Sequence, residues 1–175
     1  MKKIGFIGTG LMGFPMAKNI LKSGYKLKAF NRSSSKAKAL EEFGAEITMT
    51  LSELVKDSEI IITMLTDDEA IDEVMGSLNF LDNLKPRSIV IDMSSIKPIT
   101  AKKHEKNLSL KKIKYLDAPV SGGTIGAENG SLAIMIGGEK KVFKEVEDLL
   151  KTMGNPTVVG PVGSGQVSKL ANQII

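Results

Sequence analysis

Short runs of β-branched residues alternate with longer segments of helical period along the whole 175-residue chain. This alternation is typical of a parallel β-sheet covered by helices. The predicted strands are residues 3–7, 26–30, 59–65, 88–92, 114–117, 132–136 and 157–159. The predicted helices are residues 11–23, 35–43, 52–56, 67–75, 98–107, 140–153 and 165–175. We therefore expect an α/β fold with a doubly wound, mostly parallel sheet, whose strand carboxyl ends form one ligand-binding edge.

The composition excludes several kinds of site. The chain has no cysteine and one histidine, which rules out disulfides, thiolate nucleophiles, iron–sulfur clusters and zinc sites built on cysteine or on several histidines. The consecutive carboxylates Asp67, Asp68 and Glu69 are interpreted as a helix start, and no metal is predicted. His104 lies among lysines in a predicted helix and is expected at the surface.

Positive charge is concentrated at the N-terminus. Residues 1–40 contain nine lysines and arginines and no acidic residue, so the other 135 residues carry 15 basic against 20 acidic side chains, a net charge of −5. Such asymmetry indicates an anionic partner, either nucleic acid or a phosphorylated small molecule.

The N-terminus also imitates a secretory signal, because two lysines precede an apolar stretch. Four glycines and Pro15 interrupt that stretch, and no cleavage-like site follows it. No apolar run approaches the roughly 18 residues that a membrane span needs. We expect a cytoplasmic protein that has no membrane partner.

The first predicted strand is followed at once by Gly8-Thr9-Gly10-Leu11-Met12-Gly13, with the spacing G-x-G-x-x-G. In a dinucleotide site the first glycine makes a tight turn, the second lets the backbone approach a pyrophosphate, and the third lets the helix pack on the strand. The helix N-terminus then receives the anion. Because a strand precedes the motif and a helix follows it, we interpret it as the cofactor turn of a Rossmann-like domain rather than a merely structural turn.

The second predicted strand is followed by Asn31-Arg32-Ser33, where NAD enzymes usually carry an acidic residue for the ribose 2′-hydroxyl. The guanidinium of Arg32 with neighbouring hydroxyls instead matches a 2′-phosphate, which predicts NADP, with NAD as the alternative. The simpler interpretation is that Arg32 faces water and the serines start a helix. Nucleic acid is not expected as a partner, because no stacking or groove-reading motif accompanies the basic residues.

Four segments together carry a more specific signal than the glycines alone. They are FIGTGLMGFPMAKN at residues 6–19, IDMSS at 91–95, DAPVSGG at 117–123 and GSGQVSKLANQ at 163–173. In order and spacing they resemble the β-hydroxyacid dehydrogenase family, which includes 3-hydroxyisobutyrate dehydrogenase, tartronate semialdehyde reductase and the glyoxylate/succinic semialdehyde reductases.

The resemblance implies roles that composition does not assign. The implied catalytic residue is Lys169. The implied substrate-binding residues are Ser121, Gly122, Gly123, Asn172 and Gln173. The implied neighbours of the cofactor are Met64, Leu65, Thr66 and, near the nicotinamide, Ser95. From the residues alone, an ordinary glycine turn at 121–123 and a solvated helix face around Lys169 remain open.

The last predicted helix has two faces. An apolar stripe at the spacing i, i+3, i+4, i+7 consists of Val167, Leu170, Ala171 and Ile174. The opposite face consists of Gln166, Lys169, Asn172 and Gln173. No glycine, asparagine or proline cap closes the helix, so it is either a short terminal helix or part of a longer polypeptide.

Two departures from the family pattern point to different substrates. Gln173, with Asn172 before it, looks most like the tartronate semialdehyde reductase branch, whereas Arg32 looks like the glyoxylate/succinic semialdehyde branch. Thr9 replaces the commonest leucine at a position where only the backbone approaches the cofactor.

The sequence therefore predicts an NADP-preferring oxidoreductase that interconverts a short β-hydroxy acid and its semialdehyde. The alternatives are a dinucleotide-binding module without turnover of its own, and an NAD-dependent 3-hydroxyisobutyrate dehydrogenase. By the resemblance, residues 1–162 form the cofactor domain, residues 163–175 start an interdomain helix, and the family's all-α C-terminal domain is absent from the chain. The resemblance further implies a homo-oligomer for the full-length enzyme.

Overall fold

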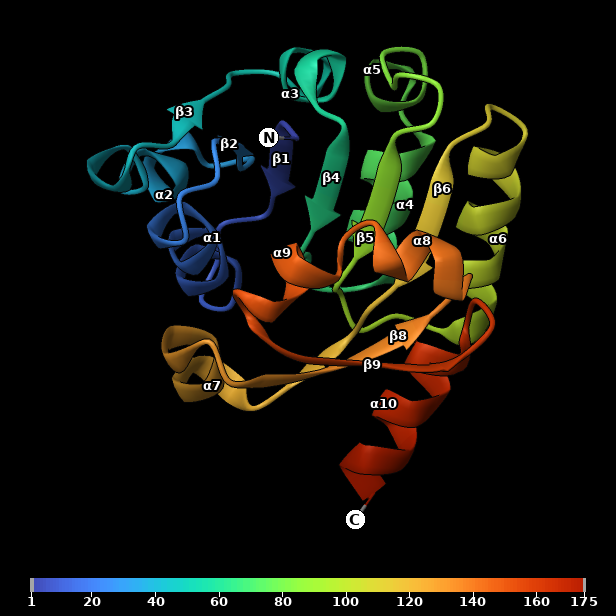
Figure 1. The fold of residues 1–175 in the computed structure, drawn as a ribbon. Coiled ribbons are helices and arrows are strands. Elements are labelled where there is room, and N and C mark those ends of the chain that lie inside the picture. Colours follow the sequence, from blue (N-terminus) through green and yellow to red (C-terminus); the bar gives the residue numbers. More distant parts are fainter. Residues whose placement is uncertain (1, 175) are drawn as a thin grey trace.

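The computed structural model describes residues 2–174 and places nine strands in one sheet (Figure 1). The strands are β1 (Ile4–Ile7), β2 (Leu27–Phe30), β3 (Glu46–Ile47), β4 (Ile60–Thr63), β5 (Ile89–Asp92), β6 (Lys114–Asp117), β7 (Val120–Ser121), β8 (Leu132–Gly137) and β9 (Gly154–Gly160). Their order is β3-β2-β1-β4-β5-β6-β8-β7, with β9 paired to β8. The predicted doubly wound, mostly parallel α/β fold is confirmed.

The first six strands of this order are parallel. Every residue of β1, β4 and β5 is buried. Burial on both faces explains why these strands are continuous apolar runs in the sequence rather than alternating ones. In-register pairing places Ile7, Thr63 and Asp92 side by side, so the turns that follow these three strands meet at one edge.

Helices cover both faces of the sheet. They are α1 (Gly13–Lys22), α2 (Ser34–Lys38), the 3-10 helix η1 (Glu41–Phe43), α3 (Leu51–Asp57), α4 (Asp68–Gly76), α5 (Leu78–Leu81), α6 (Pro98–Ser109), α7 (Gly123–Asn129), α8 (Lys140–Lys144), α9 (Glu147–Lys151) and α10 (Ser164–Ile174). On one face of the sheet, α1, α8 and α9 pack through a core that contains Met16 and Leu150. On the other face, the helices α3, α4, α5 and α6 pack through a core that contains Leu54 and Ile71. None of the described helices is long and apolar enough to cross a membrane.

The last part of the sheet changes direction. β8 pairs antiparallel with β6 and β7 and parallel with β9. In Figure 1, β8 and β9 cross beneath the ends of the parallel strands, and α10 projects away from them toward the C-terminus. The sheet therefore delivers α10 to the same edge as the turns after β1, β4 and β5.

Several boundaries differ from the prediction. The predicted helix 140–153 divides into α8 and α9 at Val146, whose buried backbone has φ −127° and ψ 3°. The predicted helix 35–43 divides into α2 and η1. Four elements were not predicted: β3, β7, α5 and α7. The first three have only two to four residues each, too few to show a hydrophobic period, and α7 is rich in glycine.

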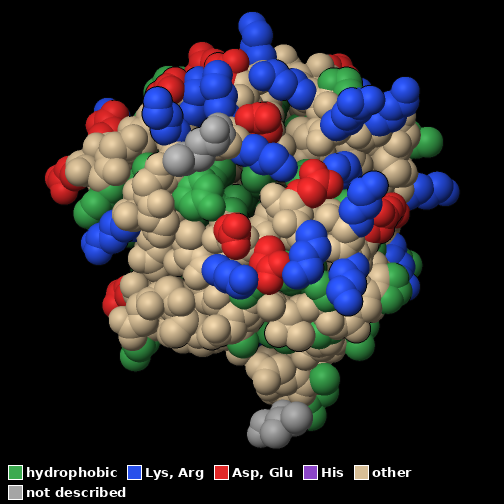
Figure 2. Space-filling model, in the orientation of Figure 1, with side chains coloured by type: hydrophobic (Ala, Val, Ile, Leu, Met, Phe, Trp, Pro, Cys, Tyr) green, Lys and Arg blue, Asp and Glu red, His purple; other side chains and the backbone are tan. Residues whose placement is uncertain are grey.

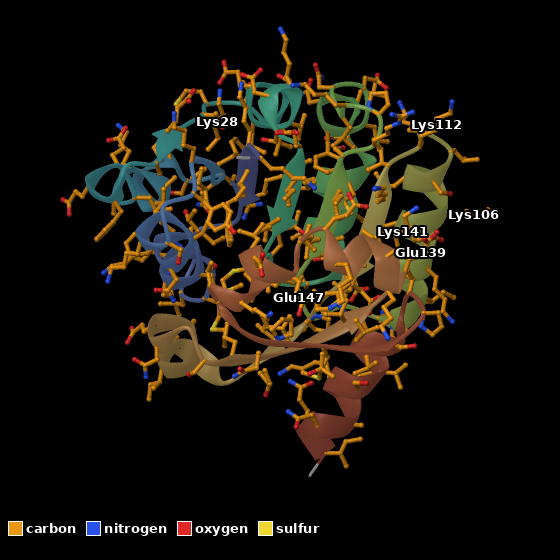
Figure 3. The ribbon with its side chains drawn as sticks, in the orientation of Figure 1. Lys28, Lys106, Lys112, Glu139, Lys141 and Glu147 are labelled. Carbon is orange, nitrogen blue, oxygen red and sulfur yellow. The ribbon has the colours of Figure 1, made fainter. Side chains whose placement is uncertain are left out.

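Charged side chains lie at the periphery of the fold. Figure 2 shows lysine and arginine interspersed with aspartate and glutamate over one face of the molecule. Lys28 of β2 bridges Glu46 of β3 at 2.8 Å and Asp57 of α3 at 3.0 Å (Figure 3). These contacts, chiefly the hydrogen bond to Glu46, raise the pKa of Lys28. Part of the basic N-terminal charge is thus neutralised locally.

The prediction for His104 was wrong, because this residue is buried and 3% exposed. Ala101 lies three residues before it and Leu108 four residues after it, so the three share one face of α6. Ala101 and Leu108 are both buried. Its Nε2 lies 2.8 Å from Oδ1 of Asp72 on α4. Burial lowers the pKa of His104 below 6.5, against the opposing attraction of Asp72.

We expect His104 to make the fold sensitive to acid. Because its folded-state pKa is lowered, the stability it contributes is present above its unfolded pKa of about 6.5 and is lost as the pH falls through the folded value. Urea unfolding at a series of pH values should show the wild type losing unfolding free energy on acidification relative to His104→Gln. Parallel curves for the two proteins would contradict this expectation.

Candidate functional site

A cavity of about 490 Å³ opens where β1, β2 and β4 end. The predicted site residues that line it are Gly8, Gly10, Asn31, Arg32, Ser33, Met64, Leu65 and Thr66. Ala70 and Val74 of α4 and Leu51 of α3 add apolar surface. The cavity therefore combines a glycine turn, a cationic loop and an apolar wall in one place.

The three glycines of the turn are each required for a different reason. Gly8 has φ +97°, and a Cβ there would collide with the carbonyl oxygen of Met64 on the neighbouring strand end. A Cβ at Gly13 would collide with the carbonyl oxygen of Gly8, so α1 starts in close contact with β1. At Gly10 no atom lies within 4 Å of a Cβ position. The backbone of the turn is thus open to a ligand at Gly10, which fits the cradle of a dinucleotide pyrophosphate.

Asn31 connects the glycine turn to the cationic loop. Its Oδ1 accepts the Thr9 N–H at 2.9 Å, and its Nδ2 donates to the Ser33 carbonyl at 3.0 Å. These two bonds fix the loop that carries Arg32, whose side chain is exposed. The hydroxyls of Ser33 and Ser35 lie 3.0 Å apart. The loop therefore presents a guanidinium and hydroxyls, and no carboxylate, at the end of β2.

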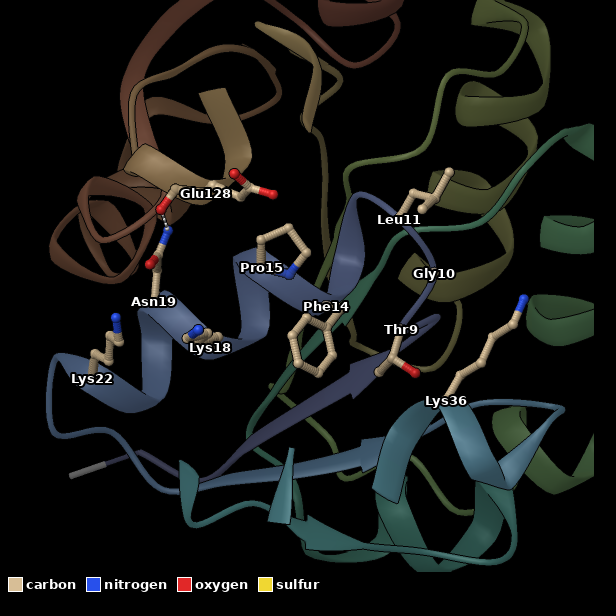
Figure 4. A pocket seen from close by; sticks show the side chains of 10 residues that line it. All are labelled: Thr9, Gly10, Leu11, Phe14, Pro15, Lys18, Asn19, Lys22, Lys36 and Glu128. Atoms are coloured by element: carbon tan, nitrogen blue, oxygen red, sulfur yellow. Dashed lines mark hydrogen bonds between the residues drawn. The ribbon is translucent and has the colours of Figure 1, made fainter. Parts of the chain in front are cut away.

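A second cavity of about 580 Å³ lies along α1, beside the same turn (Figure 4). Thr9, Gly10 and Leu11 line it, together with Lys18, Lys22 and Lys36, Phe14 and Pro15, Asn19 and Glu128. Gly10 and Lys36 line both cavities, so the two adjoin. Three predicted cofactor residues line neither: Met12 packs against the core, Gly13 is buried, and Ser95 is exposed after β5.

A buried polar network holds the ends of β4, β5 and β6 together. Oδ1 of Asp92 accepts the Thr63 hydroxyl at 2.9 Å and the Ser94 N–H at 3.0 Å, and Oδ2 accepts the Tyr115 hydroxyl at 3.3 Å. The Ser94 hydroxyl in turn accepts the Leu65 N–H at 2.9 Å. The backbone at the apolar wall of the first cavity is thereby fixed to β5. Ser95, predicted near the nicotinamide, is exposed directly after this network.

The start of α10 is attached to the same edge. Oδ1 of Asp117 accepts the Gly163 N–H at 2.7 Å, and Oδ2 accepts the Gln166 N–H at 3.0 Å. Burial raises the pKa of Asp117, although these backbone donors oppose the rise. Sequence reasoning assigned no role to Asp92 or Asp117. The available signal was a carboxylate at the end of an otherwise apolar strand.

The predicted substrate residues lie on two segments that touch, the Ser-Gly-Gly segment at residues 121–123 and the helix α10. Nδ2 of Asn172 donates to the Ser121 hydroxyl at 2.9 Å, so α10 and the loop after β7 meet. Gly122 and Gly123 have φ +137° and +61° and start α7.

The other residues of α10 differ in burial. Lys169 is half-buried and Gln173 is exposed. The apolar stripe of α10 does not face the core, because Val167, Leu170 and Ile174 are 55%, 50% and 86% exposed.

The raised pKa of Asp92 predicts a pH-dependent stability. Burial raises it from 3.8 to about 6, so its stabilising contribution is present below the unfolded value and is lost as the pH rises through about 6. A rise of about two units corresponds to about 3 kcal/mol. Asp92→Asn removes the charge and keeps the oxygen that accepts from Thr63 and Ser94, while its amide NH₂ can donate to the Tyr115 hydroxyl. We therefore expect it to be more stable than the wild type above pH 7 by up to that amount, and the gap to close near pH 4, in chemical unfolding. A variant that is less stable at every pH would contradict this.

Comparison with known proteins identifies relatives along the whole chain. Residues 3–163 match the family described as the NAD binding domain of 6-phosphogluconate dehydrogenase. The 2-hydroxy-3-oxopropionate reductase of Escherichia coli is 43% identical over 99% of this chain and 60% of its own length. Mycobacterium tuberculosis 3-hydroxyisobutyrate dehydrogenase, solved with L-serine, has a TM-score of 0.95 at 29% identity, over 99% of this chain and 60% of that one. Psf3 in complex with NADP+ and 2-OPP has a TM-score of 0.94 at 28% identity, over 98% of this chain and 61% of that one. The chain thus spans about three fifths of the length of these relatives.

Proposed function

This chain belongs to the family of the NAD binding domain of 6-phosphogluconate dehydrogenase, and we propose that it is the cofactor-binding part of an NADP-preferring oxidoreductase. Its relatives are dehydrogenases and reductases, in agreement with the resemblance found in the sequence. The proposed reaction interconverts a short β-hydroxy acid and its semialdehyde. The observation that carries the proposal is the cavity at the sheet edge, where eight predicted cofactor residues meet.

The glycine turn and the walls of the first cavity suit a nicotinamide dinucleotide. The open backbone at Gly10 and the N-terminus of α1 would hold the pyrophosphate, and the apolar wall at Met64, Leu65 and Thr66 would lie along the cofactor. When bound, the nicotinamide supplies or accepts the hydride. The chain's own residues hold that ring, orient the substrate and manage one proton.

The preference for NADP rests on the loop after β2. Arg32, Ser33 and Lys36 line the cavity, and Asn31 occupies the position expected for an acidic residue. A guanidinium binds phosphate in a planar, bidentate geometry. Psf3, a structural relative, was solved with NADP+, which supports the same cofactor here.

We expect Arg32→Ala to lose NADPH affinity and leave NADH affinity nearly unchanged. Hydrogen bonds to charged groups contribute about 1.5–3 kcal/mol, so the ratio of the two dissociation constants should change about 10- to 100-fold. Nucleotide fluorescence titration measures both constants. Lys38→Ala is the matched control, because Lys38 is an exposed cation on α2 that lines neither cavity. A wild type that prefers NADH would refute the argument and favour the NAD-dependent alternative.

Lys169, Ser121 and their neighbours carry the proposed chemistry. The Ser121 hydroxyl and the backbone N–H groups of Gly122 and Gly123 would bind the substrate carboxylate, with Asn172 and Gln173 beside them. Lys169 would donate a proton to the nascent alkoxide during reduction, or accept the hydroxyl proton during oxidation. The bond from Asn172 to Ser121 supports this proposal, because it joins the lysine helix to the proposed substrate loop.

We expect Lys169→Ala to reduce kcat at least about 100-fold, because general acid–base groups contribute about 10²- to 10⁴-fold. NADPH affinity should remain unchanged. Lys169→Arg is the matched control, since it keeps the charge but cannot release the proton, and it should be equally inactive. The assay is NADPH oxidation with a panel of short semialdehydes, including tartronate semialdehyde. Retained kcat in either variant would contradict the assignment.

A second candidate is a dinucleotide-binding module without turnover of its own. It is favoured by the position of Lys169, which lines neither of the two cavities and lies on a helix whose buried residues are Gly165 and Gln166. Tight NADPH binding by the 175-residue chain without semialdehyde turnover would support the module. Turnover by the same chain would support the enzyme.

A further inference from the structure

Gln166 joins the first turn of α10 to the loop after β5. Its side chain is 1% exposed. Nε2 donates to the Ser94 carbonyl at 2.9 Å, and Oε1 accepts the Ile96 N–H at 3.1 Å. Both polar atoms of the amide are therefore paired with the backbone of the loop after β5. Because the two paired residues, Ser94 and Ile96, flank the exposed Ser95, the amide holds the loop on both sides of Ser95.

The other attachments of α10 lie mostly at its start, apart from the hydrogen bond from Asn172 to Ser121. Gly165 and Gln166 are its buried residues. Asp117 holds the backbone at Gly163 and Gln166, and Gly165 lies so close to the Met135 carbonyl that a Cβ would collide with it. Beyond this point the helix projects from the sheet (Figure 1). The helix is thus held closely at its first turn and again at Asn172.

A continuous series of hydrogen bonds runs from the first cavity to this turn. The Leu65 N–H donates to the Ser94 hydroxyl, the Ser94 N–H donates to Asp92, and the Ser94 carbonyl accepts from Gln166. Lys169 follows Gln166 by three residues, which places the two on one side of the helix, about 60° apart. The Gln166 amide therefore links the backbone at the cavity wall to the helix turn that precedes Lys169.

We propose that Gln166 is a positioning residue for the reaction proposed above: its amide fixes Lys169 relative to the loop that carries Ser95. This inference rests on the proposed function. Gln166 touches no reacting atom and acts through α10. Misplacement of a catalytic group by about 1 Å reduces turnover by about 100-fold, so loss of both amide bonds is expected to affect kcat more than binding.

The test compares two variants with a stability control in the full-length protein. Gln166→Met keeps the length of the side chain and removes both hydrogen bonds. Gln166→Glu keeps the acceptor for the Ile96 N–H but sets an oxygen against the Ser94 carbonyl. Val142→Ala is the control, because Val142 is 5% exposed in α8 and lines neither cavity. The measurements are Tm, the NADPH dissociation constant, and kcat and KM for the best semialdehyde.

We expect Gln166→Met to lose about 10- to 100-fold in kcat with NADPH affinity within about twofold of the wild type. Gln166→Glu should lose at least as much kcat as Gln166→Met, because its buried carboxylate faces the Ser94 carbonyl. The control should keep its kcat despite a lowered Tm. A kcat for Gln166→Met within twofold of the wild type, or an equal kcat loss in the control, would overturn the inference alone. A wild type that binds NADPH but reduces no semialdehyde would overturn the proposed function and this inference with it.

Discussion

Two buried carboxylates at neighbouring strand ends receive their hydrogen bonds from protein donors, and both parts of the site depend on that arrangement. The register of the parallel sheet pairs Asp92 directly with Asp117. An isolated buried charge costs several kcal/mol unless donors surround it. Asp92 takes its donors from β4, the β5 turn and Tyr115, whereas Asp117 takes them from the start of α10. One edge of the sheet therefore organises the first cavity and the start of α10 together.

The two carboxylates differ in what they hold. Asp92 receives two side-chain hydroxyls and one backbone N–H, so it fixes strands that already pair with one another. Asp117 receives backbone N–H groups of the first turn of α10, which lack partners within the helix. The first carboxylate stiffens the sheet edge, and the second attaches to it a helix whose far end is held by the hydrogen bond from Asn172 to Ser121. The side chain of Gln166 adds a contact between the first turn of this helix and the loop after β5.

The fold was predictable where burial leaves a pattern in the sequence. Burial on both faces makes continuous apolar runs of β1, β4 and β5, and the first cavity lies at the strand carboxyl ends, the edge predicted to bind a ligand. The burial of two polar residues was not predicted. Gln166 lies on the polar face of the last predicted helix, yet the β5 loop offers both a donor and an acceptor for its amide. The lysines around His104 predicted a surface position, but its helical neighbours Ala101 and Leu108 place it on the buried face of α6. Partners distant in sequence decide both cases, and no local pattern contains them.

The structure shows which basic side chains of the first 40 residues lie beside the cavities and which are paired elsewhere. Lys28 is paired with Glu46 and Asp57 at the edge of the sheet and contributes little to any ligand. By contrast, Arg32 lines the first cavity, Lys18 and Lys22 line the second, and Lys36 lines both. Within residues 2–174 none of these four forms an ion pair. Two carboxylates, Glu128 in the second cavity and Glu73 in the first, line the same space. A phosphorylated ligand at the glycine turn therefore meets a lining with more cations than anions, a local excess that the modest net charge of +4 conceals.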